Sequence, residues 1–342
     1  MTEIRLPEVL SSLIRGEDLD DATTAAVMGL IMRGDATAAQ IAGLLMALRI
    51  KGETGEEIAG LVRSMRAFAL PVTVEGPLVD TCGTGGDRAG TFNVSTISAL
   101  VAAGAGARVA KHGNRAASGR CGSADLLEAW GVAIDLPPKA VARCITQVGI
   151  GFCFAPKYHP AMRHVVPARR ELGVPTVFNF LGPLTNPAGA LHQTIGVSDP
   201  AMAPKMAEVL ARLGSEHALV FHGSDGLDEL TTTGPSTIWE VRSGAVTQYD
   251  FDPAEYGIAR AQVADLKGGD LEDNLRIANE VLDGAAGAPR DIVVLGAAAA
   301  LLAADLAGEW EDALAAAARS LDSGAARQIR DDWVTLSKSL AT

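Results

Sequence analysis

Aromatic residues and cysteines are scarce in this chain of 342 residues. Phe, Trp and Tyr together make up 4% of the sequence, whereas Ala, Leu and Val dominate, so we expect an aliphatic core. The four cysteines show no CxxC spacing and no partnered histidine pattern, which argues against a disulfide scaffold and against a zinc site. Free thiols of this kind are typical of a reducing cytoplasm, where we expect the protein to be located.

Long hydrophobic runs are also lacking. The most apolar stretch, residues 292–307, is about 16 residues long and ends in a segment that contains Asp305, whereas a membrane-spanning helix needs roughly 20. Its alanine-rich composition favours a buried helix over a membrane span. The N-terminal sequence MTEIRLPEVL carries charges and no apolar segment, so we expect no secretory signal and no membrane partner.

Positive charge is in deficit. Lys and Arg number 29 against 41 Asp and Glu, which gives a formal net charge of −12. A surface this acidic argues against a general nucleic-acid binder, because neutralising phosphates requires a basic face. An anionic ligand would therefore have to be bound by local elements: backbone N–H groups, a helix N-terminus, a few placed cations or a metal ion.

The first part of the chain has helical periodicity throughout. Apolar residues recur three and four positions apart, for example at Ile41, Leu44, Leu45 and Leu48. No strand-like segment interrupts this region, so we predict a small all-helical domain over residues 1–72.

Two helix starts within this region have capping signals. Asp35 is the expected N-cap of a helix over residues 36–50. Thr54 followed by Glu57 has the form of a capping box, which predicts the start of a further amphipathic helix that continues to Leu70.

Strand-like and helix-like runs alternate over the rest of the chain. This alternation predicts an α/β domain over residues 73–342, with a mostly parallel central sheet flanked by helices. In such sheets ligands bind at the carboxyl ends of the strands. The strand-like runs are residues 78–86, 107–114, 151–154, 176–178, 194–197, 217–222, 237–241 and 292–295, and the clearest helix-like runs are residues 95–107, 123–130, 201–213 and 274–283.

The first candidate site is the glycine-rich loop DTCGTGGDRAGTFNVST, residues 80–96, between a strand and a helix. Its glycines let the backbone approach a ligand and adopt positive φ, so that successive N–H groups can point at one anion. An ordinary strand-to-helix turn is the alternative, but the density of donors favours phosphate binding, and the spacing is neither GxGxxG nor GxxxxGK[ST]. The additional donors at the helix start are Thr91, Asn93, Ser95 and Thr96.

A second polar loop follows the next strand, with the sequence KHGNR at residues 111–115 and further donors at Ser118 and Ser123. A diphosphate needs more than one binding surface, and the point charge of Lys111 suits a phosphate. By itself His112 is more often a packing or capping histidine.

Two further groups complete the candidate site. Asp228 and Glu229 follow a strand-like run. Adjacent carboxylates on a loop usually lie at a solvated edge. However, Mg²⁺ binds through one or two carboxylates plus substrate oxygens and waters, which favours a metal site here. Arg163, Arg169 and Arg170 lie in a predicted helix, where an arginine is normally a surface residue. One that faces a cleft could instead hold a carboxylate in a bidentate contact.

Taken together, these segments resemble the anthranilate phosphoribosyltransferase family. The similarity runs in order and spacing over about residues 80–229, in the motifs GTGGD with TFNVST, KHGNRAASGRCGSAD, GIGFCFAPKYHPAMRHVVPARRELG, FNFLGPLTNPA and DGLDEL. It implies transfer of the 5-phosphoribosyl group from 5-phosphoribosyl 1-diphosphate to the amine of anthranilate, in tryptophan biosynthesis. It also implies the fold of the pyrimidine nucleoside phosphorylases. It further implies a homodimer formed through the helical domain, and the helical segment at about 159–185 would belong to that domain.

The resemblance assigns individual residues as well. Gly83, Asn114 and Arg169 would contact anthranilate, with Arg169 on its carboxylate. Two Mg²⁺ ions per site would bind, one to Ser95 with Glu229 and the other to Asp228 with Glu229. The contacts to phosphoribosyl diphosphate would be Gly83, Gly86, Asp87, Thr91, Asn93, Val94, Ser95, Thr96, Lys111, His112, Gly113, Asn114, Arg115, Ala116, Ala117, Ser118, Gly119 and Ser123.

The implied reaction needs no catalytic side chain of its own. An aromatic amine is neutral at pH 7 and keeps a free lone pair, so positioning and stabilisation of the departing diphosphate must supply most of the catalysis. A nucleoside phosphorylase of the same fold is the nearest alternative, but the Asp228–Glu229 pair argues against it. A nucleic-acid-binding relative would need basic patches, and a purely structural protein leaves the ordered motifs unexplained.

Overall fold

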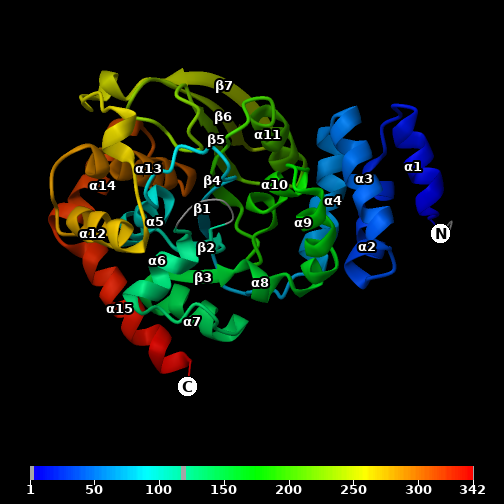
Figure 1. The fold of residues 1–342 in the computed structure, drawn as a ribbon. Coiled ribbons are helices and arrows are strands. Elements are labelled where there is room, and N and C mark those ends of the chain that lie inside the picture. The colour runs from blue at the N-terminus through cyan, green and yellow to red at the C-terminus, as the bar shows by residue number, and fades with distance from the viewer. Residues whose placement is uncertain (1–3, 117–120, 342) are drawn as a thin grey trace.

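The computed structural model describes residues 4–116 and 121–341. Figure 1 shows a helical unit at the N-terminus beside a larger α/β unit that carries the sheet. The N-terminal part contains no strand among the described residues, as predicted from its periodicity. Its helices are α1 (Leu6–Ile14), α2 (Asp21–Arg33), α3 (Ala38–Lys51) and α4 (Gly55–Ala67).

The helix starts agree with the sequence in one case and differ in the other. Thr54 and Glu57 form the predicted capping box of α4, with both reciprocal hydrogen bonds present. At α3 the prediction of Asp35 is wrong, because Thr37 is the N-cap and forms a capping box with Gln40. The carboxylate of Asp35 instead accepts a hydrogen bond from Arg33 Nε at 2.9 Å.

The central sheet has seven strands in the order β3-β2-β1-β4-β5-β6-β7. The first five strands in this order are parallel to one another, whereas β6 pairs antiparallel with β5 and β7 antiparallel with β6. The predicted mostly parallel sheet is therefore confirmed. The strands are β1 (Val79–Gly83), β2 (Val109–Gly113), β3 (Ile150–Phe154), β4 (His192–Gly196), β5 (His217–Gly223), β6 (Ser236–Arg242) and β7 (Ala245–Phe251).

Two predicted strands are wrong. Residues 292–295 lie inside the helix α13 (Ala288–Ala303), which is buried from Ile292 to Ala303 except at Gly296, so its apolar residues follow no single face. The β-branched run Ile292–Val294 satisfies strand propensity, but burial on all sides overrides it. Residues 176–178 form a turn into the short helix α10 (Phe178–Leu181), where Asn179 Oδ1 accepts from Thr176 N at 3.0 Å.

One strand was not predicted. β7 pairs with β6 through a two-residue hairpin turn, Ser243–Gly244, in which both residues have positive φ. This is the conformation of a type I′ turn, which matches the twist of paired strands. Most of β7 is exposed, and only Phe251 is buried, so the apolar alternation that would reveal a strand is weak.

The two faces of the sheet belong to two hydrophobic clusters. Along β5, Leu219 and Phe221 pack into one cluster, whereas Ala218 and Val220 pack into the other, as expected for the period of a strand. The second cluster continues without a break into α1–α4, so the helical unit shares its core with that face of the sheet. The remaining α-helices are α5 (Val94–Gly104), α6 (Ser123–Trp130), α7 (Pro138–Val148), α11 (Ala203–Arg212), α12 (Leu271–Leu282), α14 (Trp310–Asp322) and α15 (Ala325–Leu340).

The segment after β3 crosses to the helical unit in short pieces. The helical segment expected at about 159–185 is broken, because the 3-10 helix η1 (Pro160–His164) ends before α9 (Val166–Leu172) begins. η1 contacts α2, and α9 contacts α3. The division of the chain at residue 72 stays a prediction. The other short helices are α8 (Ala155–Tyr158), η2 (Pro183–Thr185), η3 (Pro253–Tyr256) and η4 (Val263–Leu266).

The four cysteines are free thiols. Over the described ranges, no helix combines the length and the apolar character that crossing a membrane requires.

Candidate active site

Four parallel strands end in glycine at the same edge of the sheet: Gly83 of β1, Gly113 of β2, Gly196 of β4 and Gly223 of β5. A Cβ atom at Gly83 would collide with the carboxylate of Asp228, and a Cβ atom at Gly196 would collide with the backbone carbonyl of Asp228. The missing side chains therefore let the loops after these strands pack against one another. The predicted glycine loop, the second polar loop and the acidic pair all begin at this edge.

The glycine loop combines tight backbone turns with a contact to the acidic pair. Gly85 and Gly86 have φ of 70° and 86°, the left-handed region that glycine adopts readily. Gly85 N donates to Asp228 Oδ2 at 2.6 Å. Gly83 has no positive φ, so at this position glycine is required for space and not for its backbone conformation.

Sequence reasoning missed Gly196 and Ser198 at the end of β4. Ser198 N donates to Thr84 Oγ1 at 3.1 Å, and Ser198 Oγ donates to Gly85 O at 2.8 Å. These bonds fix the first residues of the glycine loop against β4. The only signal in the sequence is another strand that ends in glycine and a hydroxyl residue, which is too common a pattern to single out.

The start of α5 supplies the donors expected after the glycine loop. Asn93 is its N-cap residue, and Val94, Ser95 and Thr96 form its first turn. The Asn93 amide donates through Nδ2 to Cys121 O at 3.1 Å, whereas its Oδ1 and the hydroxyl of Thr96 have no hydrogen-bond partner among the described residues. Thr91 lies just before, in an isolated bridge with Lys267.

Lys111 is buried beneath these loops, with 2% of its surface exposed. Its Nζ donates to Thr81 O at 2.6 Å and to Ser95 Oγ at 3.3 Å. No carboxylate of the described residues lies within ion-pair distance of it. Burial lowers the pKa of Lys111, and burial raises the pKa of neighbouring Asp80 to about 6, although the charge of Lys111 opposes that rise.

Three carboxylates, Asp87, Asp228 and Glu229, gather at the ends of β1 and β5, and none of them forms an ion pair with a described residue. Burial and the neighbouring Asp87 raise the pKa of Asp228. Burial and the charge of Asp228 raise the pKa of Glu229 to about 8, although Lys111 and a backbone bond from Ser95 oppose this. Asp87 Oδ2 has no hydrogen-bond partner in the part of the chain that the structure describes. Such a cluster is stabilised by a cation that binds from outside.

No group of three or more His, Cys, Asp or Glu side chains in the described parts of the chain forms a complete metal centre. Mg²⁺ does not require one, because it usually binds proteins through one or two carboxylates and completes its shell with substrate oxygens and waters. The hard oxygen donors of Ser95, Asp228 and Glu229 fit this ion.

In the second polar loop, the side chain of Arg115 forms ion pairs within the chain. The Arg115 guanidinium pairs with Asp125 at 2.7 Å and with Glu128 at 2.9 Å, so its charge is committed to α6. Ser123 Oγ donates to Asn114 O at 3.1 Å, which closes the loop. Gly113 leaves room for that hydroxyl. Ala116 donates its N–H to Asp125, and the predicted contacts Ala117, Ser118 and Gly119 lie outside the described residues.

Two buried histidines, His112 and His159, lie side by side near this edge. Burial lowers the pKa of His112 to about 3 and that of His159 to about 4. The His112 ring donates through Nδ1 to Gly182 O at 3.1 Å, and the two rings lie 5.0 Å apart. His164 accepts from Arg163 Nε at 3.2 Å and lies over Gly34 at the end of α2.

Of the three arginines considered in the sequence, Arg169 alone is part-buried, since Arg163 and Arg170 are more exposed. Its guanidinium lies over the ring of Phe178, 5.4 Å from the centroid. It makes no ion pair with any described residue, and burial lowers its pKa. A part-buried guanidinium without an anionic partner suits an anionic ligand.

Two surface cavities lie away from these loops. One of about 560 Å³ is lined by residues 214–216, 242–244 and Asp305, and the other, of about 380 Å³, lies between α3 and α9. Neither lining includes a glycine loop or the acidic pair, so the convergence of unpaired polar groups locates the candidate site better than cavity volume does.

Two family descriptions match the sequence. Residues 7–69 match the helical bundle domain of a glycosyl transferase family, and residues 75–327 match its a/b domain.

Relatives with the same overall length are known. An anthranilate phosphoribosyltransferase of Nocardioides sp. is 56% identical over 333 residues, which cover 96% of this chain and 97% of the relative. The crystal structure of anthranilate phosphoribosyltransferase from Thermus thermophilus has a TM-score of 0.91 and 46% identity, covering 96% of this chain and 99% of that one. The Saccharomyces cerevisiae anthranilate phosphoribosyltransferase, solved in complex with PRPP and Mg, has a TM-score of 0.89 and 26% identity, covering 98% of both chains.

Proposed function

The chain belongs to the anthranilate phosphoribosyltransferase family, and from this premise we propose that it transfers the 5-phosphoribosyl group of 5-phosphoribosyl 1-diphosphate to the amine of anthranilate. The products are N-(5-phosphoribosyl)anthranilate and diphosphate, in the biosynthesis of L-tryptophan. The observation that carries this proposal is a set of charges that form no ion pair with a described residue: buried Lys111 and the acidic pair at one edge of the sheet, and the part-buried guanidinium of Arg169 on α9. A substrate or a metal ion can provide the opposite charge to each of them.

Phosphoribosyl diphosphate binds between the two polar loops. The N–H groups of the glycine loop and of the first turn of α5 face the phosphates, where the helix dipole adds positive potential. Lys111 contributes a point charge from below. The residues proposed for this substrate are Gly83, Gly86, Asp87, Thr91, Asn93, Val94, Ser95, Thr96, Lys111, His112, Gly113, Asn114, Arg115, Ala116, Ala117, Ser118, Gly119 and Ser123.

Two Mg²⁺ ions bind per site, one held by Ser95 with Glu229 and the other by Asp228 with Glu229. When bound, the ions neutralise the charge that develops on the departing diphosphate. Gly85 N holds Asp228 Oδ2 at 2.6 Å, which orients that carboxylate toward the loop that receives the phosphates.

Anthranilate contacts Gly83, Asn114 and Arg169, with its carboxylate on the guanidinium. The amine keeps its lone pair at neutral pH, so the side chains orient it toward the ribose carbon and need not remove a proton first. Displacement of diphosphate gives that carbon oxocarbenium character, which preorganised backbone dipoles and charges stabilise.

The quaternary state and location are further parts of this proposal. The helical unit, over residues 1–72 and joined by the segment at about 159–185, forms a homodimer in the cytoplasm. Ile14 and Ile50, at the ends of α1 and α3, are about 80% exposed and support an apolar contact there. Light scattering of the wild-type chain and of an Ile14→Lys, Ile50→Lys variant tests this contact. We expect a dimer for the wild type and a monomer for the variant. A variant that is still a dimer would contradict a contact through these two residues.

The reaction itself is tested by anthranilate fluorescence. The purified protein should consume the fluorescence only when phosphoribosyl diphosphate and Mg²⁺ are both present. Omission of either one, and addition of EDTA, are the controls. No loss of fluorescence under saturating conditions would show that the protein has a different function.

A further inference from the structure

Arg169 is oriented by an aromatic ring and by no acceptor of the described chain. Its guanidinium lies 5.4 Å from the centre of the Phe178 ring, and Phe178 is buried, with 6% of its surface exposed. A ring face attracts a cation and leaves the N–H groups at its edge free for a ligand, whereas a carboxylate partner would occupy them.

The segment that carries Phe178 is fixed from three directions. After α10, three successive carbonyls each accept a hydrogen bond from a different element. His112 of β2 donates to Gly182 O at 3.1 Å, Gln193 of β4 donates to Pro183 O at 2.9 Å, and Arg66 of α4 donates to Leu184 O at 2.8 Å. Two of these donors come from the sheet and one from the helical unit.

Arg66 is the unusual member of this set. It is part-buried near the end of α4, makes no ion pair with any described residue, and uses its Nε on a neutral carbonyl. An unpaired cation in such surroundings costs stability that an apolar residue would avoid. Burial lowers the pKa of Arg66, in agreement with this cost. The interaction with Leu184 O connects the helical unit to the segment that supports Arg169.

We propose that Phe178 and Arg66 are positioning residues for the substrate carboxylate: the Phe178 ring sets the orientation of the Arg169 guanidinium, and Arg66 fixes the segment that carries the ring. This inference rests on the proposed function, in which Arg169 binds anthranilate. Arg169 itself lies on α9, which packs on α3, whereas Gly83 and Asn114 lie at the ends of β1 and β2. The position of the helical unit relative to the sheet thus sets how the carboxylate contact and the other anthranilate contacts are spaced.

Steady-state kinetics of the full chain, with phosphoribosyl diphosphate and Mg²⁺, test the proposal. Phe178→Leu should raise the KM for anthranilate about five- to tenfold, the value of a part-buried cation–π contact. Arg66→Met should raise it about threefold, since a displaced binding group loses part of its contact. The KM for phosphoribosyl diphosphate should change less than about twofold. Phe178→Tyr and Arg66→Lys should restore most of the loss.

Arg63→Met is the matched control, because Arg63 lies one turn earlier on α4, is exposed and pairs with Asp21. It should leave both KM values unchanged. An equal rise in both KM values for Phe178→Leu, or an effect of Arg63→Met as large as that of Arg66→Met, would overturn the inference.

A double-mutant cycle with Arg169→Ala separates positioning from general damage. Once Arg169 is absent, Phe178→Leu and Arg66→Met should no longer change the KM for anthranilate. Additive effects would overturn the inference even when every variant folds. If Phe178→Leu does not fold, the Arg66→Met cycle gives the same test. An inactive wild-type protein would refute the proposed function, whereas an active wild type with additive variants refutes the positioning role alone.

Discussion

Two lysines in this protein, part-buried Lys51 and buried Lys111, have opposite surroundings. Lys51 lies at the end of α3 in the helical unit, and Lys111 lies near the end of β2 beneath the candidate site. Burial opposes the charge on both. Their neighbours decide the outcome, since the pKa of Lys51 is raised and that of Lys111 is lowered.

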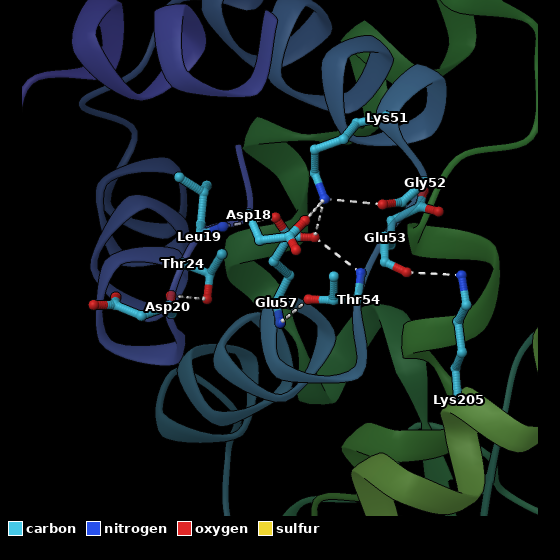
Figure 2. Close-up of polar contacts among 10 residues, drawn as sticks. All are labelled: Asp18, Leu19, Asp20, Thr24, Lys51, Gly52, Glu53, Thr54, Glu57 and Lys205. Atoms are coloured by element: carbon cyan, nitrogen blue, oxygen red, sulfur yellow. Dashed lines mark hydrogen bonds and ion pairs between the residues drawn. The ribbon is translucent and has the colours of Figure 1, made fainter. Parts of the chain in front are cut away.

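The Lys51 ammonium is fully paired (Figure 2). It donates to Asp18 at 2.6 Å, to Glu57 at 3.0 Å and to Gly52 O at 2.9 Å. Glu57 is completely buried and also accepts from Leu19 N and Thr54 N. The capping box of α4 therefore forms part of an ion cluster that ties the loop before α2 to the ends of α3 and α4.

Figure 2 also shows that this corner contacts the α/β unit, where Lys205 of α11 donates to Glu53 O at 2.8 Å. Around Lys51 the charges compensate one another within the chain. Around Lys111 the ammonium donates to one carbonyl and two hydroxyls and to no carboxylate of the described residues, while the nearby carboxylates have raised pKa values. A compensated cluster supports the fold, whereas an uncompensated one leaves binding capacity for a ligand.

The largest expected effect comes from the uncompensated side. Replacing both Asp228 and Glu229 with Ala should reduce the turnover number by about a thousandfold or more and remove the dependence on Mg²⁺, because the ions lose their carboxylates. Initial rates across a Mg²⁺ titration measure this. The matched control is Glu311→Ala with Asp312→Ala, an acidic pair in the first turn of α14, which should retain wild-type rates. Full activity of the Asp228, Glu229 variant would refute the metal site.

The compensated side should respond in stability. Lys51→Met leaves the Glu57 carboxylate buried without its cation, so the free energy of unfolding should fall by about 3–5 kcal/mol. Urea unfolding measures the change, and the turnover of the folded protein at 25 °C should stay the same. Arg49→Met, at an exposed position on the same helix, is the control. A Lys51→Met protein as stable as the wild type would show that the cluster is not needed.

Arg169 should affect one substrate and not the other. Arg169→Ala should raise the KM for anthranilate about ten- to a hundredfold, the loss of one charged hydrogen-bonded contact, and leave the KM for phosphoribosyl diphosphate nearly unchanged. Arg170→Ala, next to it and exposed, should have little effect. An unchanged anthranilate KM would show that another residue binds the carboxylate.

The smallest effect is a pH dependence of stability without Mg²⁺. The pKa of Glu229 is raised to about 8 in the folded protein, so the folded state holds this proton more tightly than the unfolded state. Stability from this group is complete below its ordinary pKa, about 4.5, and is lost as the pH rises through 8. We therefore measure the decrease in Tm between pH 5 and pH 9 for both proteins. This decrease should be a few degrees smaller for Glu229→Gln than for the wild type. Identical pH profiles would contradict this.

Local chemistry was enough to predict the elements that depend on nearby residues. The capping box of Thr54 and Glu57 needs only four consecutive positions, and it forms as expected. The glycine loop between β1 and α5 likewise follows from adjacent residues. At the start of α3 the prediction from nearby residues was wrong, because Thr37 and not Asp35 is the N-cap.

Other features depend on residues far apart in the chain. The burial of residues 292–295 within a helix follows from the elements that surround α13, which no local propensity records. Gly196 is needed because Asp228 packs against it, and Arg115 is neutralised by Asp125 and Glu128 of α6. Each of these outcomes required the folded neighbours.

The sequence by itself determined the parallel α/β architecture, the polar loops at the strand ends and the residue types that suit a phosphate. Only the tertiary structure decided which of the charges stay uncompensated. The sequence alone does not show that Lys51 and Lys111 differ, because the partners of Lys51 include Asp18, which is 33 positions away. Electrostatic compensation depends on distance in space and on exclusion of water, and both are set by packing between segments that are distant in the sequence.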